Sequence, residues 1–307
     1  MFKGSEEIPA GFDSPTALPK TAEEAKAWQD ANRAWWEKNP MRYDFFQKLE
    51  TEQEFSREMW LEIDRRFLAL SDEYLYNRKL PFDQLIPYDE LPKLDVLEVG
   101  VGNGTHAALL APHAKSFTGI DLTDYATRST SARFEKFGLP GRILQMDAEK
   151  MEFPDASFDF IWSWGVIHHS SDTSAIIRQM HRVLRPGGRA IVMVYHRSLW
   201  EYHIRRGFFF SLYNRMCRRE GSAHRVTQMT IDGGLARFYT KREWTDLVRG
   251  QFNVERYDVF GQRPHAVPLP SRWRDSAARY VPKSLANLLL TQLSQGQYLV
   301  AHMTRCD

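Results

Sequence analysis

A carboxylate and three glycines stand together in the stretch VLEVGVGNGTH, which begins at Val96. Glu98 lies at the end of an apolar run, and Gly100, Gly102 and Gly104 follow it at alternate positions. Glycine costs conformational entropy on folding, and its missing side chain lets another molecule approach the backbone closely. The stretch therefore predicts a loop against which a ligand lies, with the N–H groups of a following helix nearby.

Two further carboxylates end later apolar runs of the chain. Asp121 closes the run in GIDLT, and Asp147 follows the run in RILQMD. A carboxylate at the first of these positions can accept hydrogen bonds from both hydroxyls of a ribose. One at the second can accept a hydrogen bond from the amino group of an adenine. Together with Glu98 and the glycines, this order predicts a site for an adenosyl group joined to an amino acid.

These side chains need strands that bring them to one edge of a sheet. Residues 93–196 alternate helical candidates with short apolar runs, namely KLDVLEVG, SFTGIDL, RILQMD, FDFIWSW and RAIVMVYH. The alternation predicts a parallel sheet with helices on both faces. In such sheets ligands bind beyond the carboxyl ends of the strands. We expect FNVERYDVF and GQYLVAHMT to be late strands.

Four motifs in sequence order carry a resemblance to a known family. VLEVGVGNGTH, IDLT, DAEKMEFPDASFDFIWSWGVIHHSSD and MHRVLRPGGRAIVMVYH resemble the successive motifs of class I S-adenosylmethionine-dependent methyltransferases. They are most similar to the ubiquinone/menaquinone-biosynthesis branch (methyltransferase domain 11), over roughly residues 93–196. The resemblance implies an α/β, Rossmann-like sheet of seven mostly parallel strands, the last one antiparallel between its neighbours. It also implies S-adenosylmethionine as cofactor, S-adenosylhomocysteine as product and methyl transfer to a small organic molecule.

The resemblance implies a role in cofactor binding for ten residues. On the methionine side it places Glu98, Gly100, Gly102, Gly104, Thr105 and Trp164; beside the ribose and adenine it places Asp121, Leu122, Asp147 and Ala148. The acceptor could be an oxygen, nitrogen or carbon nucleophile, and most of the catalysis should come from proximity and orientation.

A general base is needed only if the attacking atom carries a proton. His169 in HHSSD and His196 in YHR are the candidates, because histidine titrates near working pH. Tyr43 is a third candidate catalytic residue. Together with Trp35 and Trp36 it could cover the cofactor. Alternatively, the segment that contains them is an amphipathic helix that packs its aromatic side chains on the domain. HHSSD lacks a full set of metal ligands, and no metal is expected.

The flanking segments are expected to be mainly helical. Residues 1–20 contain three prolines and are predicted to be a flexible arm. Residues 21–92 are predicted to form an N-terminal helical cap, with a capping box at Thr21 and a second helix over about 52–76. Residues 28–46 are predicted to close over the cofactor as a lid. Residues 93–307 would form the cofactor-binding domain, with 197–230 and 261–295 as helical insertions on the substrate side.

The segment 197–225 combines aromatic side chains with seven arginines and two glutamates. It could form an apolar roof over the acceptor, contact an anionic membrane surface, dock on another protein or pack on the core as an ordinary amphipathic helix. Because arginine pairs with carboxylate and phosphate, an anionic acceptor is a variant of the roof.

Composition limits the class of protein further. The 41 basic and 39 acidic residues give a net charge of +2, which offers no reason to expect nucleic acid as a partner. Two distant cysteines favour a reducing compartment, and without the apolar core of a signal peptide at the start we expect a cytoplasmic protein. No apolar run is long enough to predict a transmembrane helix. The oligomeric state stays open.

Two other functions compete with methyl transfer. An NAD-dependent oxidoreductase would also place glycines after the first strand, but the G-x-G-x-G spacing and Asp147 speak against it. A non-catalytic protein that binds S-adenosylmethionine and a protein partner is the other, and no feature of the sequence excludes it.

Overall fold

The computed structural model of the chain describes residues 9–43, 53–75, 79–210, 212, 223–228, 231, 234–269 and 271–307. The first eight residues of the predicted arm, residues 44–46 of the predicted lid and most of 211–222 lie outside these ranges.

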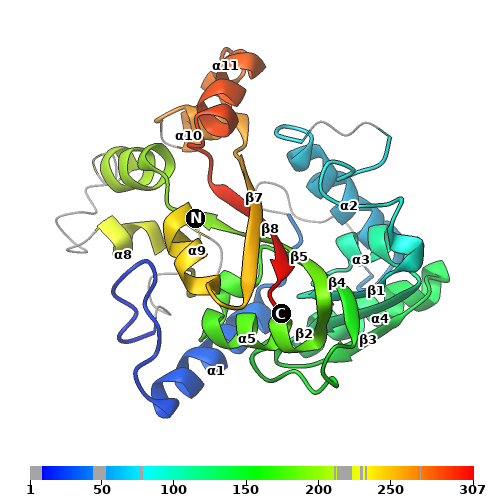
Figure 1. The fold of residues 1–307 in the computed structure, drawn as a ribbon. Coiled ribbons are helices and arrows are strands. Elements are labelled where there is room, and N and C mark those ends of the chain that lie inside the picture. The colour runs from blue at the N-terminus through cyan, green and yellow to red at the C-terminus, as the bar shows by residue number, and fades with distance from the viewer. Residues whose placement is uncertain are drawn as a thin grey trace.

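One mixed sheet organises the molecule (Figure 1). Its strands are β1 (Asp95–Val99), β2 (Ser116–Asp121), β3 (Arg142–Gln145), β4 (Phe158–Trp164), β5 (Leu184–His196), β6 (Phe238–Tyr239), β7 (Phe252–Phe260) and β8 (Tyr298–Arg305). They run in the order β3-β2-β1-β4-β5-β8-β7, and the two-residue strand β6 pairs with the end of β5. The first five are parallel, whereas β8 is antiparallel to both β5 and β7. The predicted fold class and the late antiparallel pair are confirmed.

Strand alternation divides the core into two layers. Leu97, Ile161 and Val192 belong to one apolar cluster, whereas their sequence neighbours Val96 and Trp162 belong to the other. Successive side chains of a strand point to opposite faces, so a sheet buried on both sides reads as a continuous apolar run. The helices α5 (Thr173–Val183) and α9 (Lys241–Val248) pack on the first face; α3 (Thr105–Leu110) and α4 (Asp124–Phe137) pack on the second.

The N-terminal segment forms two helices, α1 (Ala22–Lys38) and α2 (Arg57–Ser71). The second helix is shorter than predicted, because Ser56 caps it and Phe55, just before, has a positive φ of 56° that no helix accommodates. At α1, Thr21 accepts a hydrogen bond from the backbone N–H of Glu24 as expected. The Glu24 carboxylate accepts from the N–H of Lys20, one residue before the position that a capping box requires.

Residues 9–20, the described part of the predicted arm, contact the rest of the chain. The Phe12 ring is buried with its centroid 5.5 Å from that of Trp28, and the backbone N–H of Phe238 donates to the carbonyl of Pro15 at 2.9 Å.

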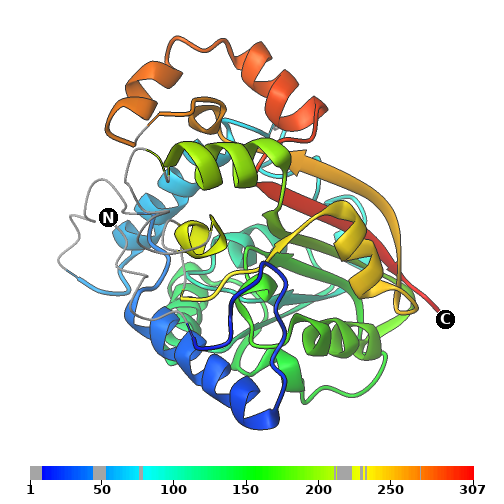
Figure 2. The same cartoon turned by 90° about the vertical axis from the view of Figure 1, so that its left-hand side faces the viewer.

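The C-terminal part adds helices at one end of the sheet. They are the π-helix η5 (Leu199–Phe210), α8 (Ala223–Gln228), the 3₁₀-helix η6 (Arg263–Ala266), α10 (Ser271–Ala278), α11 (Lys283–Asn287) and the π-helix η7 (Leu288–Gln292). In both views α10 and α11 stand at the top of the molecule, and Figure 2 shows η5 running directly below them. Both segments predicted as insertions, 197–230 and 261–295, thus contain helices in the described ranges, and their role on the substrate side stays a prediction. None of the helices in those ranges is long and apolar enough to cross a membrane.

Candidate active site

A cavity of about 250 Å³ lies where β1, β2 and β4 end. Its walls come from the loops after these strands, from α1 and α2, and from the ends of β5 and β8. Nine of the ten residues predicted to bind the cofactor line the cavity. The tenth, Gly104, is the N-cap residue of α3. The lining residues among them are Glu98, Gly100, Gly102, Thr105, Asp121, Leu122, Asp147, Ala148 and Trp164.

The three glycines after β1 serve different purposes. All have positive φ, at 84° for Gly100, 51° for Gly102 and 78° for Gly104, a region that other residues rarely adopt. A Cβ at Gly100 would lie 2.3 Å from the Val166 side chain, and one at Gly104 would lie 2.9 Å from that of Thr130. A Cβ at Gly102 would meet no protein atom within 4 Å. Gly100 and Gly104 therefore allow close packing, whereas Gly102 leaves room for a ligand.

The Asp121 carboxylate is fixed by backbone donors. Its Oδ2 accepts a hydrogen bond from the N–H of Gly102 at 3.1 Å, and its Oδ1 accepts from the N–H and hydroxyl of Thr123 at 3.0 and 2.8 Å. Burial raises the pKa of Asp121, and these hydrogen bonds partly offset the rise. The side chain is thus held rigidly at the cavity wall, beside the glycine loop.

Glu98 is an unsatisfied buried carboxyl group. The residue is 2% exposed, and its Oε2 has no hydrogen-bond partner among the described residues. Burial, followed by the neighbouring Asp121 carboxylate, raises the pKa of Glu98 well above its ordinary value. Because a buried charge without a partner is costly, this group is suited to a ligand that brings a cation or hydrogen-bond donors.

Asp147 is hydrogen-bonded to the N-terminal helix α1 at the cavity wall. Its Oδ1 accepts hydrogen bonds from the Gln29 side chain of α1 and from the N–H of Glu149, both at 2.9 Å. The Gln29 carbonyl oxygen in turn accepts from the N–H of Ser171 at 3.2 Å. One glutamine therefore connects α1 to two loops of the domain.

The segment after Gln29 continues along the cavity wall. Trp36, Met41 and Tyr43 line it, whereas Trp35 is buried and does not. The Asn103 amide donates to the carbonyl of Met41 at 2.7 Å. Part of the segment 28–46 therefore lines the cavity, and its closure over the cofactor stays a prediction.

The far end of α1 is bonded to the start of α4. The Glu37 carboxylate accepts hydrogen bonds from the N–H groups of Asp124 and Tyr125, at 2.9 and 3.0 Å. These N–H groups lack partners inside the helix, so the carboxylate caps α4 from outside. With Gln29, near the middle of the helix, this contact anchors α1 at two points.

Thr105 lines the cavity, but its hydroxyl is used inside the protein. It donates to Oδ1 of Asp64 in α2 at 2.7 Å. Arg133 of α4 pairs with the same carboxylate at 2.5 Å and donates to the carbonyl of Asn103 at 3.1 Å. This network connects α2 and α4 to the glycine loop.

One end of the cavity is lined mainly by aromatic side chains. Trp164 lies parallel to Trp162 with ring centroids 5.5 Å apart, and His106 packs beside both of them. The other aromatic lining residues of the same apolar cluster are Tyr43, Phe67, Tyr74 and Tyr298. The described lining residues include no lysine or arginine. This end can enclose an apolar or planar group.

The two candidate histidines have different locations. His169 lines the cavity next to Trp36, and its Nδ1 lies 2.7 Å from the carbonyl oxygen of Leu235. Nδ1 therefore donates, which leaves Nε2 as the acceptor of the neutral ring. Burial lowers the pKa of His169 to about 4, so the ring is neutral near pH 7.

His196 is outside the cavity lining. Its Nδ1 lies 3.0 Å from the carbonyl oxygen of Gly296, and burial lowers its pKa to about 4. The preceding residue, Tyr195, does line the cavity, because successive side chains of a strand point to opposite faces. The structure thus brings His169 and Tyr43 to the cavity and leaves His196 on the other side of β5.

Several lining residues were not among the predicted site residues. They include Gln29, Asn32 and Met41 from the N-terminal part and Gln262 and Tyr298 from the C-terminal part. A signal for the first group exists in the sequence, because residues 29, 32 and 36 share one face of a helix.

Similarity to known proteins is concentrated in the core of the sheet. Residues 97–192 match the family described as methyltransferase domain. A 27-O-demethylrifamycin SV methyltransferase from Amycolatopsis mediterranei is 37% identical over 97 residues, which are 31% of this chain and 36% of the relative. A phosphatidylethanolamine N-methyltransferase from Cereibacter sphaeroides is 32% identical over 100 residues, 32% of this chain and 49% of the relative. The match thus spans less than half the length of either relative.

The fold extends beyond this segment. The crystal structure of the MccD protein is 13% identical to this chain, covers 74% of it and 96% of its own length, and superposes with a TM-score of 0.51. At this identity the likeness concerns the fold alone.

Proposed function

We propose that this chain, whose residues 97–192 match the methyltransferase domain family, transfers a methyl group from S-adenosylmethionine to a small organic acceptor. The observation that carries the proposal is the meeting of Glu98, Asp121 and Asp147 at one cavity, beside the open space at Gly102. When bound, the cofactor supplies an activated methyl group on a positively charged sulfonium. The chain's own residues would bind it and align the acceptor, so proximity and orientation would provide most of the rate enhancement.

The residues at the cavity fit this cofactor. The unsatisfied Glu98 carboxyl group would pair with the ammonium of the methionine part, which removes the cost of an unpartnered buried charge. Asp121, held beside the glycine loop, would accept the ribose hydroxyls. Asp147 would accept from the adenine amino group, with Leu122 and Ala148 alongside.

The aromatic end of the cavity supports an acceptor with an apolar body. Tyr43, Phe67, Trp164 and Tyr298 offer flat apolar faces there, and the described lining offers no cationic side chain. The two relatives are named for an oxygen and a nitrogen methylation, so they do not choose between these nucleophiles.

His169 would be the base if the acceptor atom carries a proton. It lines the cavity, is neutral near pH 7 and keeps Nε2 as an acceptor. With a pKa of about 4 it would assist by accepting a hydrogen bond and, transiently, a proton. Tyr43 would help to cover the reacting groups. The cytoplasmic location stays a prediction.

The test is transfer of label from methyl-labelled S-adenosylmethionine to a panel of phenols, amines and carbon acids. Wild type should form labelled product and S-adenosylhomocysteine, and Asp121→Asn should be at least tenfold slower at limiting cofactor. Asp155→Asn, a surface change 78% exposed on the side chain, is the matched control and should behave as wild type. Binding of NADH without binding of S-adenosylmethionine would refute the proposal in favour of an oxidoreductase.

A further inference from the structure

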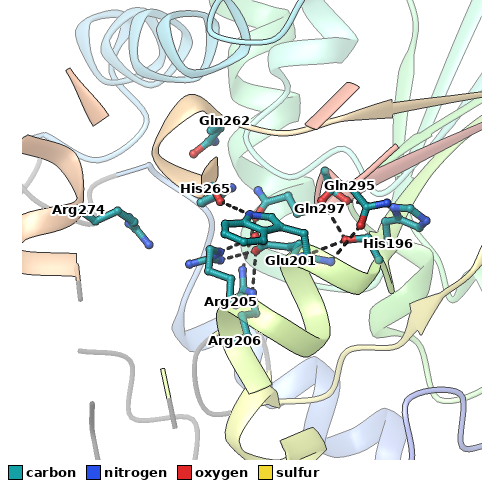
Figure 3. Close-up of polar contacts among 12 residues, drawn as sticks. His196, Glu201, Arg205, Arg206, Gln262, His265, Arg274, Gln295 and Gln297 are labelled. Atoms are coloured by element: carbon teal, nitrogen blue, oxygen red, sulfur yellow. Dashed lines mark hydrogen bonds and ion pairs between the residues drawn. The ribbon is translucent and has the colours of Figure 1, made fainter. Parts of the chain in front are cut away.

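A second group of charged side chains is buried in the C-terminal insertions. We call it the arginine cluster; it consists of Glu201, Arg205 and Arg206 of η5, His265 of η6 and Arg274 of α10 (Figure 3). The exposed fractions of the side chains are 1% for Glu201, 6% for Arg205, 13% for Arg206 and 18% for Arg274. Charges at this depth are costly unless each has a partner.

Within the cluster, one carboxylate serves two guanidinium groups. Arg205 holds both oxygens of Glu201 with its Nε and Nη2, and the Nε of Arg206 donates to Oε1 of the same carboxylate at 2.9 Å. Burial alone would raise the pKa of Glu201, but the arginines outweigh it and keep the group ionised. Both carboxylate oxygens of Glu201 therefore accept hydrogen bonds from arginines other than Arg274.

Arg274 has a weak partner only. Its Nε lies 3.3 Å from Oδ1 of Asp275, whose side chain is 48% exposed. Its two terminal nitrogens have no hydrogen-bond partner among the described residues. Among the described carboxylates, the half-exposed Asp275 is therefore the one that pairs with Arg274. Figure 3 shows Arg274 reaching from α10 toward Arg205 with no bond drawn between them.

His265 provides a second unsatisfied group. The residue is 7% exposed, and its Nδ1 has no hydrogen-bond partner among the described residues. Burial lowers the pKa of His265 well below its ordinary value; Glu201 opposes the shift and the arginines add to it. The other charged side chain of η6, Arg263, is paired with Glu73 at 3.4 Å, so it does not change the balance.

We propose that the arginine cluster binds an oxyanion, the carboxylate or phosphate group of the acceptor. The free terminal nitrogens of Arg274 can hold two oxygens of such a group side by side, a geometry that guanidinium provides and ammonium does not. The neutral His265 can donate a further hydrogen bond from Nδ1. The bound group would give Arg274 an anionic partner for its terminal nitrogens and His265 an acceptor for Nδ1.

The cluster is adjacent to the cavity. Gln262 lines the cavity and occupies the N-cap position of η6. Its carbonyl oxygen accepts a hydrogen bond from the backbone N–H of His265 at 2.8 Å. A 3₁₀-helix rises about 2 Å per residue, so three residues span roughly 6 Å. On the strand side, Arg206 Nη2 lies 3.4 Å from the Gln297 side chain, and the next residue, Tyr298, lines the cavity. An acceptor with its apolar body in the cavity can therefore extend an anionic end to the cluster.

Oxyanion binding is tested on the full chain with S-adenosylhomocysteine present. Inorganic phosphate and acetate are titrated separately at constant ionic strength into wild type, Arg274→Gln and Arg279→Gln. Arg279 is exposed one residue past the end of α10, so its variant is a control of equal charge change. We expect wild type and the control to bind at least one of the two anions, and Arg274→Gln to bind it at least tenfold more weakly. Which probe binds distinguishes phosphate from carboxylate.

Three results would overturn the site: no binding of either anion by wild type, equal affinity in Arg274→Gln, or an equal loss in the control. Unchanged affinity for S-adenosylhomocysteine shows that each variant is folded. Arg274→Lys is the second variant, and it should also bind the anion more weakly because it keeps the charge without the forked donors.

The assignment of the oxyanion to the acceptor rests on the proposed methyl transfer, and a separate measurement tests it. Acceptors that differ only in a carboxylate or its methyl ester are compared in wild type and Arg274→Gln. The ester should have at least a tenfold higher KM in wild type, and the variant should lose this difference while kcat changes little. Equal KM values in wild type would overturn the assignment. If no acceptor is methylated while phosphate or acetate binding still depends on Arg274, the proposed function fails and the oxyanion site stands.

Discussion

Replacing Glu98 with glutamine should stabilise the ligand-free protein near neutral pH. The carboxyl group is buried, and its Oε2 has no hydrogen-bond partner among the described residues. Burial, and then the Asp121 carboxylate, raise its pKa well above the ordinary value of 4.5. An ionised group at this position therefore opposes folding, and an amide of nearly the same shape removes the charge.

The size of the effect depends on pH in a defined direction. In the unfolded chain Glu98 loses its proton near pH 4.5, whereas the folded protein retains it to higher pH. Because the folded state then binds more protons, the free energy of unfolding of wild type falls as pH rises, by about 1.4 kcal/mol per pH unit, until the folded-state pKa is reached. Glutamine does not titrate. The variant should match wild type at pH 4 and become progressively more stable than wild type as pH rises above 4.5.

Urea denaturation at several pH values measures this difference, with Glu152→Gln as the matched control at an exposed position. The same variant should bind S-adenosylhomocysteine at least tenfold more weakly, since hydrogen bonds to charged groups contribute about 1.5–3 kcal/mol. A stability difference that does not change between pH 4 and pH 6 would refute the argument from burial. Unchanged affinity would remove Glu98 from the cofactor site.

Two further variants test the helix α1 and the candidate base. Gln29→Ala removes hydrogen bonds to Asp147 and Ser171, so amide hydrogen exchange across α1 should become faster and S-adenosylhomocysteine affinity should drop by about tenfold. Arg33→Ala, at an exposed position of the same helix, is the control and should change neither quantity. Unchanged exchange in Gln29→Ala would mean that packing alone holds α1. His169→Gln should lower kcat with a proton-bearing acceptor by 10²-fold or more, on the order of a lost general base. Because the unfolded histidine takes up a proton near pH 6.5 and the folded one only near pH 4, wild-type stability should fall as pH drops between these values. Over the same pH range, the free energy of unfolding of His169→Gln should fall less than that of wild type. If urea denaturation gives the same pH dependence for both proteins, His169 is not buried in its neutral form.

The sheet could be predicted because its signals are local. Each parallel strand is a short apolar run, and the acids and glycines stand at the ends of those runs. Once β1, β2 and β4 are neighbours, their carboxyl ends must meet, so Glu98 and Asp121 reach one cavity without further information. The antiparallel pair β7 and β8 followed from the family resemblance rather than from a pattern in the residues.

Contacts between distant segments could not be predicted in this way. Gln29 of α1 donates a hydrogen bond to Asp147, which lies 118 residues later in the sequence. No local sequence pattern specifies a contact between segments so far apart. Strand alternation places Tyr195 and His196 on opposite faces of β5, but it does not say which of the two faces the cavity. The start of α2 at Ser56 depends on the positive φ of Phe55, which the apolar spacing does not reveal. Likewise, the arginine excess of residues 197–225 did not show that Glu201 is shared by two arginines.

The central claim is that the three acids and the glycine loop form a site for S-adenosylmethionine, and calorimetric titration with S-adenosylhomocysteine tests it most directly. Wild type should bind one equivalent, Asp121→Asn should bind at least tenfold more weakly because charge-assisted hydrogen bonds are lost, and NADH should not bind. Absence of S-adenosylhomocysteine binding by folded wild-type protein, or equal affinity in Asp121→Asn, would contradict the account.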